Sequence, residues 1–263
     1  MHSGAARPQA YVGNLPTDVA TPDRAHAGFT RVALEPGQSA EVAIPIDRRS
    51  LQYWDVDANR WVTPTGAVPL YVGSSLEDIR VTGELSVPAD TVAPTVTITP
   101  DPAQPDGDRG WYVSPVTLAF AATDDQDAAP VVEVSVNGGE FSVQDGPLVL
   151  EADGVYTVTA RARDAAGNVS EPVTVEIRLD RTPPTVTAER TRLRLLIAIS
   201  ASDQVSGVAS IQYRYRLTVG ERDITTPWRR YVSPVLALPN ARLVLEYRAT
   251  DNAGNVSAVS TFP

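Results

Sequence analysis

Short runs in which apolar and polar residues alternate fill most of this chain. Alternation at every second position is typical of half-buried β-strands. It is clear at 41–46, 132–136 and 155–160, whereas helix-period stretches are hard to find. Turn residues separate the runs, and Asn137-Gly138 predicts a type I′ hairpin, because both central residues of that turn need a positive φ. The pattern therefore predicts an all-β chain of short strands.

A nine-residue segment occurs twice in the second half of the chain. Ala162–Ser170 recurs almost unchanged as Ala249–Ser257, a shift of 87 residues. The correspondence runs back without a gap to Phe141, which matches Trp228. The second copy lacks 11 residues near its start, so the two stretches are expected to be one β-module written twice with local differences.

Linkers that contain proline mark the module boundaries. The segments 88–94 and 180–184 both lead into Pro-Thr-Val-Thr. Proline disfavours the α conformation at the preceding residue and stiffens a connection. We therefore expect three tandem β-sandwich modules, at 1–88, 91–180 and 181–263, with about seven strands in each complete sandwich.

Several motifs follow one another in order within the first module. They are Ala27–Gln38, Tyr53–Asp55, Arg60–Val62, Tyr71–Ser75 and Asp78–Arg80. This string resembles the C-terminal fibronectin type III-like domain of glycoside hydrolase family 3, the β-glucosidase family. The family domain has one strand more before the segment that matches 9–12, so we expect the first strand to be missing and the chain to be a piece of a longer protein.

The resemblance implies a non-catalytic chain. The family's Asp nucleophile and Glu acid/base lie in two upstream domains, so no residue here inherits a catalytic role. The implied parent is a secreted enzyme that acts on β-linked glucosides. The implied partners are the upstream catalytic domains, in the same polypeptide or in a separate chain.

The second and third modules resemble bacterial Ig-like repeats of secreted and cell-surface proteins. The resemblance is carried by Ala-Pro-Thr-Val-Thr at 93–97 and by Asp-x-Ala-Gly-Asn-x-Ser at 164–170 and 251–257. It implies an extracellular or cell-surface accessory region that spaces or tethers catalytic domains near polysaccharide or cell wall. The alternatives are a carbohydrate-binding module or an adhesion module that acts on its own.

Composition narrows the classes of partner. The net charge of −10 divides into −4 over 1–90, −11 over 91–180 and +5 over 181–263. All 22 basic residues are Arg, and this bias suggests a GC-rich bacterial source. An acidic chain argues against nucleic acid. There is no Cys, so no disulfide or thiolate metal site is expected. No run approaches the length of a membrane span, and the first residues are not those of a signal peptide.

Aromatic residues are the candidates for sugar binding, because an aromatic ring offers an apolar face with a polar edge. The pair Trp111 and Tyr112, in the stretch that the second copy lacks, is the first candidate, and Trp228 with Tyr231 is the second. Trp54 and Trp61 could act in the same way. The competing interpretation for all of these rings is packing in the core or at a sheet edge.

The repeated turn has a structural interpretation at each of its positions. We expect Asp to accept backbone N–H groups and Gly to supply a positive φ. The residues concerned are Asp164, Gly167 and Asn168 in the first copy and Asp251, Gly254 and Asn255 in the second.

Acidic clusters give weaker signals. The stretch 124–127 holds three Asp residues that could bind Ca²⁺, although the second copy keeps only Asp203 there and a solvated acidic loop is the simpler interpretation. Asp55 and Asp57 form a carboxylate pair of the kind that glycosidases use, yet they occupy a turn. We expect no metal, no cofactor and no catalysis in this chain.

Overall fold

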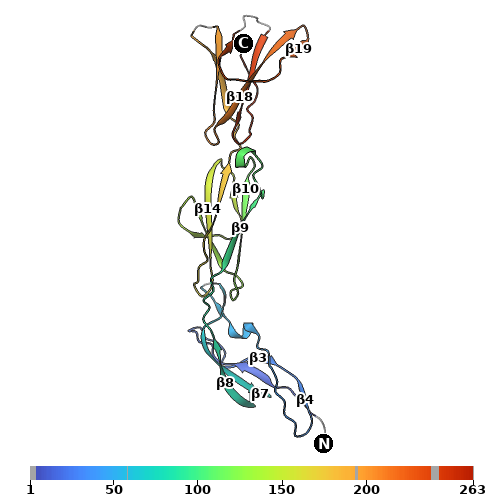
Figure 1. Ribbon diagram of the computed structural model, residues 1–263. Helices are drawn as coiled ribbons and strands as arrows, with labels where there is room; N and C mark the ends of the chain where they lie inside the picture. Colours follow the sequence, from blue (N-terminus) through green and yellow to red (C-terminus); the bar gives the residue numbers. More distant parts are fainter. Residues whose placement is uncertain (1–3, 58, 193–194, 238–242, 263) are drawn as a thin grey trace. The chain divides into compact units, whose positions relative to one another are not determined.

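The computed structural model describes residues 4–57, 59–192, 195–237 and 243–262 (Figure 1). Within these ranges the regular elements are antiparallel strands and two short 3-10 helices, η1 (Arg48–Leu51) and η2 (Asp108–Gly110). The all-β prediction is therefore confirmed. The chain forms two compact units, one of residues 1–92 with 165–168 and the other of 93–164 with 169–263. No described helix has the length and apolar character needed to cross a membrane.

The first unit is built on one four-stranded antiparallel sheet. Its strand order is β3 (Ala25–Phe29), β2 (Gln9–Val12), β7 (Gly66–Gly73) and β8 (Ile79–Val87). Two small ribbons complete the unit: β1 (Gly4–Ala6) pairs with β4 (Val32–Leu34), and β5 (Tyr53–Asp55) pairs with β6 (Arg60–Val62). The buried core is small and consists of Val12, Leu15, Ala27 and Val68.

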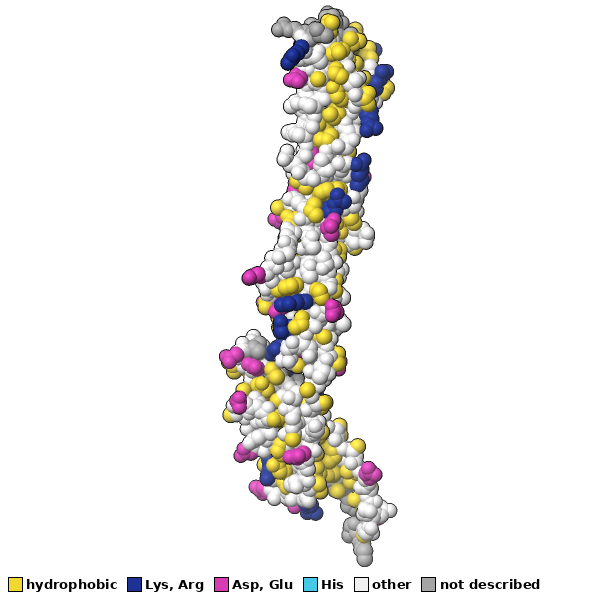
Figure 2. All heavy atoms as spheres, turned by 60° about the vertical axis from the view of Figure 1, so that its left-hand side comes forward, with side chains coloured by type: hydrophobic (Ala, Val, Ile, Leu, Met, Phe, Trp, Pro, Cys, Tyr) yellow, Lys and Arg dark blue, Asp and Glu magenta, His cyan; other side chains and the backbone are white. Residues whose placement is uncertain are grey.

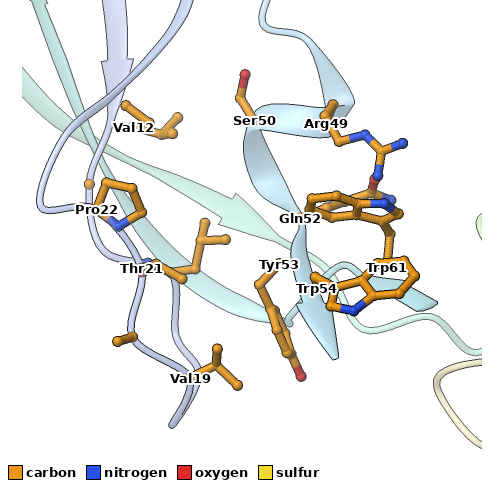
Figure 3. Close-up of a pocket in the computed structure, with 14 residues that line it drawn as sticks. Val12, Val19, Thr21, Pro22, Arg49, Ser50, Gln52, Tyr53, Trp54 and Trp61 are labelled. Carbon is orange, nitrogen blue, oxygen red and sulfur yellow. The ribbon is translucent and has the colours of Figure 1, made fainter. Parts of the chain in front are cut away.

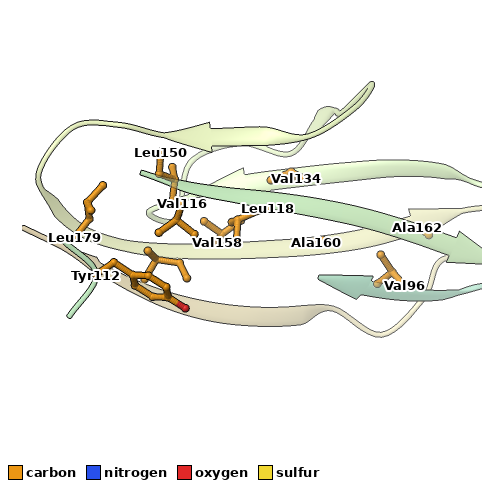
Figure 4. Packing of buried hydrophobic residues seen from close by; sticks show 11 residues of the cluster. Val96, Tyr112, Val116, Leu118, Val134, Leu150, Val158, Ala160, Ala162 and Leu179 are labelled. Carbon is orange, nitrogen blue, oxygen red and sulfur yellow. The ribbon is translucent and has the colours of Figure 1, made fainter. Parts of the chain in front are cut away.

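The second unit begins with two facing sheets. One has the order β13 (Leu148–Leu150), β10 (Val116–Thr123), β9 (Thr95–Asp101), and the other β12 (Ser142–Val143), β11 (Val131–Val136), β14 (Gly154–Arg163), β15 (Val173–Leu179). Alternate residues of these strands meet in one apolar cluster (Figure 4). Leu118, Val116 and Val158 are completely buried there, which explains why the alternation along 155–160 predicted a strand.

A second pair of sheets repeats this topology. One sheet has the order β16 (Thr185–Arg190), β17 (Leu196–Ser202), β21 (Val235–Leu236). The other runs β19 (Arg222–Thr225), β18 (Val208–Val219), β22 (Leu243–Asp251), β23 (Ser260–Phe262), and β20 (Arg229–Arg230) also pairs with β18. The strand pairings of the described residues fall into three sets, at 4–87, 95–179 and 185–262.

Of two local predictions, the turn at Asn137 is confirmed and the strand at 41–46 is not. Asn137 and Gly138 have φ values of 53° and 73°, which confirms the predicted turn with two positive φ angles. The strand predicted at 41–46 is wrong: these residues form no strand and are mostly exposed. The N–H of Asp47 donates to the Ala27 carbonyl of β3 at 3.0 Å, and η1 follows at once. Pro45 has no N–H to donate, so the approach of this segment to β3 does not become a ladder.

Candidate functional site

A concave pocket of about 420 Å³ opens on the first unit (Figure 3). One wall comes from the loop that follows β2 and the other from η1, β5 and β6. The loop is held in place by the N–H of Gly13, which donates to the Pro69 carbonyl at 2.7 Å, and by the N–H of Leu15, which donates to Thr21 Oγ1 at 3.0 Å. The residues that line the pocket are Val12, Gly13, Leu15, Val19, Ala20, Thr21, Pro22, Ala25, Arg49, Ser50, Gln52, Tyr53, Trp54 and Trp61.

Two tryptophans and an arginine form one rim of this pocket. Trp54 and Trp61 face each other across the β5–β6 ribbon, edge to face, with ring centroids 5.5 Å apart. Both remain exposed, at 40% and 43%. The guanidinium carbon of Arg49 lies 4.0 Å from the Trp61 ring centroid. Arg49 is positioned by Asp47, whose Oδ1 accepts the Arg49 N–H at the start of η1.

The first pair of predicted sugar-binding aromatics lies in the core instead. Trp111 and Tyr112 are 3% and 4% exposed, and Tyr112 belongs to the apolar cluster in Figure 4. The Arg178 guanidinium lies 4.5 Å from the Trp111 ring centroid. Desolvation raises the pKa of the Tyr112 hydroxyl, and the charge of Asp106 adds to the shift. No ring face of this pair is open to a sugar, so we do not retain it as a site.

The second predicted pair is divided between two environments. Tyr231 packs on the core of the last sheets, and its hydroxyl accepts the Ile199 N–H at 3.0 Å. Trp228 lies half-buried beside two guanidinium groups, those of Arg214 and Arg248, at 4.5 and 4.4 Å from its ring centroid. The structure therefore does not bring Trp228 and Tyr231 together as one platform.

Ionic groups extend along the same sheet face as Trp228. Glu246 accepts hydrogen bonds of 2.6 Å from Nε of both Arg214 and Arg216. Burial opposes ionisation of Glu246, but these hydrogen bonds and the two positive charges outweigh it and lower the pKa of the carboxyl group. On the face shown in Figure 2, Arg side chains are more prominent than acidic ones at the end that carries 181–263, in keeping with its charge of +5.

The repeated turns close on themselves and on the preceding linkers. In the second copy Asp251 Oδ1 accepts the Asn255 N–H at 2.8 Å, and Gly254 has a φ of 97°. In the first copy Gly167 has a φ of 96°, and Asp164 is 1% exposed. The last Asn of each turn donates to a linker carbonyl. Asn168 Nδ2 reaches the Asp90 carbonyl at 3.2 Å, and Asn255 Nδ2 reaches that of Asp180 at 2.9 Å.

One carboxylate cluster within the second unit has the oxygen donors that a hard cation prefers. Single oxygens of Asp180, Asp203 and Asp251 lie within 4.8 Å of one another, and Asp180 and Asp251 are buried. Each carboxylate also accepts backbone N–H groups. Asp180 accepts from Ser206 at 3.0 Å, and Asp203 accepts from Gly207 at 2.7 Å. These turn hydrogen bonds account for the cluster without an ion.

The neighbouring acidic residues Asp125 and Asp127 are not gathered into a metal-ligand set in the described part of the chain. Asp124 Oδ1 accepts the N–H groups of Gln126 and Asp127 at 2.9 and 2.7 Å, which is a local turn. Within the described ranges, neither Asp125 nor Asp127 belongs to a group of carboxylates close enough to share a cation. The pair Asp55 and Asp57 likewise forms a turn, with the Asp57 N–H donating to Asp55 Oδ1 at 3.0 Å.

Comparison with known proteins identifies the first part of the chain. Residues 7–76 match the family model described as "Fibronectin type III-like domain". They form such a domain. The resemblance found in the motifs of the first module is therefore confirmed over this fibronectin type III-like span.

Several curated proteins that resemble this chain are named as probable beta-glucosidases. "Probable beta-glucosidase L" of Neosartorya fischeri is 41% identical over 85 residues, which is 32% of this chain and 12% of the relative. "Probable beta-glucosidase G" of Aspergillus terreus is 43% identical over 79 residues, or 29% of this chain and 10% of the relative. The chain thus spans only about an eighth of the length of the curated relatives that it matches.

A solved structure matches the same share of the chain. The beta-D-glucoside glucohydrolase of Trichoderma reesei is 40% identical, with a TM-score of 0.31, and the match covers 32% of this chain and 12% of that one. The family model and the curated relatives bear on the fibronectin type III-like domain, and the second unit is described from its own residues.

The pocket contains residues that pattern reading did not single out. Arg49 and Ser50 follow the alternating segment 41–46, and only their position after Asp47, a residue suited to cap a helix, indicated local structure. Trp54 and Trp61 were recognised as possible sugar contacts, but their separation across a ribbon could not be derived before β5 and β6 were paired.

Proposed function

We propose that this chain is a non-catalytic accessory region of a secreted glycoside hydrolase of the β-glucosidase type. The observation that carries the proposal is the 41% identity over 85 residues to a protein named as a probable β-glucosidase. The region concerned is the fibronectin type III-like domain, in which the one carboxylate pair we considered for catalysis, Asp55 and Asp57, is engaged in a turn.

The first unit has the surface for bracing a catalytic domain in the same polypeptide. Its core is small, and large apolar side chains remain exposed on it. Phe29 is 61% exposed, Val81 60% and Val56 78%. These side chains lie on three different elements of the unit, and a partner domain that covers them would remove apolar surface from water. In this role the first unit packs against catalytic domains that supply the acid and the nucleophile.

The second unit is suited to spacing or tethering at a cell surface or near polysaccharide. Its two sandwich-like sets of sheets have the same strand order, and the Asn255 side chain ties the second turn to the linker before it. Hydrogen-bonded linkers resist bending more than free ones, because the backbone groups are fixed. A unit of this kind holds an attached enzyme at a defined distance.

An immunoblot of the producing organism's culture fluid and cell-surface fraction tests the proposal. An antibody raised against this chain is expected to detect a band several times heavier than 28.1 kDa. Native protein captured from the same fractions with this antibody should hydrolyse an aryl β-glucoside. A band near 28.1 kDa without such activity would contradict the accessory role.

A second candidate function is carbohydrate binding by the chain itself, and one observation favours it. The first unit combines a concave pocket with two exposed tryptophans at its rim. Small-molecule sites are typically concave and mostly apolar with a few placed polar groups.

A further inference from the structure

We infer that the pocket on the fibronectin type III-like domain binds a hexopyranose unit of a neutral β-glucan. The inference deepens the proposed function and rests on it for the choice of sugar, because the relatives are named as β-glucosidases. The site itself is argued from the geometry of the pocket. Its volume of about 420 Å³ lies within the roughly 300–1,000 Å³ that is usual for small-ligand sites.

The aromatic rim supplies the contact that pyranose rings require. A sugar presents an apolar face of C–H groups, which packs on an aromatic ring, and a periphery of hydroxyls. Trp54 and Trp61 meet edge to face at an interplanar angle of 69°, so their rings present two differently oriented surfaces at one rim (Figure 3). Both rings keep about two fifths of their surface open, so a ligand in the pocket can reach them.

Polar groups with unfilled hydrogen-bonding capacity lie beside this rim. Among the described residues no hydrogen bond or ion pair engages the Arg49 guanidinium, the Ser50 hydroxyl or the Tyr53 hydroxyl. All three residues line the pocket. A guanidinium has five N–H donors in a planar fork that can reach two adjacent acceptors at once. Stacking on Trp61 fixes the plane of the Arg49 group and pre-organises that fork for two neighbouring sugar hydroxyls.

The two walls are held by contacts that do not involve a ligand. Gln52 Nε2 donates to Thr63 Oγ1 at 3.1 Å, which fastens η1 to the end of the β5–β6 ribbon. On the opposite wall, a Cβ added at Gly13 would lie 2.8 Å from Pro69 Cβ, so only glycine lets the loop approach β7 this closely. The pocket is therefore formed before any ligand arrives, and binding orders few side chains.

A protein surface packing on this rim is the competing explanation. A protein partner would fill the pocket with side chains of its own. The buried centre of a protein–protein interface is apolar and holds few polar groups without a partner. Here the unfilled donors lie beside the aromatic rings at a concave site, and among the described residues no carboxylate forms an ion pair with the Arg49 guanidinium. A sugar can do both at once, because its hydroxyls accept from these donors while its apolar face covers the rings. The observations therefore favour a sugar.

Two binding measurements on the full 263-residue chain test the assignment. One is titration calorimetry with cellotetraose, and the other is retardation of the chain in native gels that contain soluble β-glucan. Wild-type chain is expected to bind, and Trp61→Ala to bind roughly tenfold more weakly or worse, since loss of a central aromatic contact commonly has this effect. Arg49→Gln should weaken binding while the circular dichroism spectrum and melting temperature stay unchanged. It serves as the second variant in case Trp61→Ala does not fold.

Matched controls use apolar and aromatic residues outside the pocket. Val56→Ala, in the turn between β5 and β6 and 78% exposed, and Trp228→Ala, on the second unit, should bind as the wild type does. Absence of binding by the wild type, unchanged binding by both Trp61→Ala and Arg49→Gln, or loss of binding in Trp228→Ala alone would overturn the assignment. The immunoblot measures the accessory role independently, so failure of one proposal is distinguishable from failure of the other.

Discussion

The Asn255 side-chain amide donates a hydrogen bond of 2.9 Å to the backbone carbonyl of Asp180, 75 residues earlier in the chain. The same amide also donates to Asp251 Oδ2 at 2.9 Å. Asp180 is 0% exposed and Asp251 is 1% exposed, so neither acceptor can turn to water if the amide is lost. The repeated turn thus ends in a side chain that fixes the linker between the two sets of sheets.

Removal of that amide is expected to destabilise the second unit. Asn255→Ala should lower the free energy of unfolding by about 1–3 kcal/mol, because it leaves buried acceptors without a donor. Urea unfolding followed by tryptophan fluorescence measures the change. Val259→Ala, at a position that is 47% exposed, is the matched control and should lie within about 0.5 kcal/mol of the wild type.

The glycine of the same turn tests backbone conformation separately. Gly254 has a φ of 97°, and a Cβ added there would lie 3.2 Å from Asp108 Oδ2. Gly254→Ala should therefore cost about 1 kcal/mol or more, since L-residues with a side chain rarely adopt this φ. Gly83→Ala, where nothing lies within 4 Å of the added Cβ, should be close to neutral when both variants are compared by urea unfolding.

Ionisation of Glu246 should make the stability of the second unit depend on pH. Its pKa lies below the ordinary value of 4.5, because hydrogen bonds from Arg214 and Arg216 outweigh desolvation. A lowered folded-state pKa gives stability that is present above pH 4.5 and is lost as the pH falls through the lower folded-state value. Melting temperatures between pH 7 and pH 3 should show this loss in the wild type.

Glu246→Gln is the variant that isolates this effect. It keeps the shape and removes the titrating charge, so it should melt lower than the wild type at pH 7 and approach it toward pH 3. Glu84→Gln, an exposed residue of β8, is the control and should follow the wild-type profile. A constant difference between Glu246→Gln and wild type across this range would show that the carboxylate charge contributes nothing.

Strands that lie inside a sandwich were predictable, because burial on one face imposes a strict period of two. β14 and β11 show this, with Val158, Ala160 and Val134 pointing to the core. The hairpin at Asn137 was predictable for a different reason, since its backbone angles restrict residue type. The segment 41–46 has the same alternation and its end lies beside β3, but Pro45 has no N–H to donate, and the apolar–polar pattern alone does not record this loss of a donor.

The candidate site was less predictable than the fold. Trp54 and Trp61 are separated by a turn, and their ring contact depends on the register of β5 with β6. The role of Arg49 depends on a 3-10 turn and on a ring 12 positions away, which no local pattern specifies. Trp111 was misplaced because its ring is buried and lies beside Arg178, a contact between residues far apart in the chain that no local pattern specifies.

Comparison of Trp111→Ala with Trp61→Ala distinguishes an aromatic residue that stabilises the fold from one that binds a ligand. Trp111→Ala should lower the free energy of unfolding by about 3–5 kcal/mol, since a buried Trp that is truncated leaves a cavity. Affinity for cellotetraose at a temperature where the variant is folded should stay unchanged, because the pocket lies on the other unit. Trp61→Ala should show the reverse pattern, with a smaller loss of stability and a large loss of affinity. Weaker sugar binding by Trp111→Ala would move the site to the second unit, whereas equal losses of stability would mean that Trp61 serves the fold.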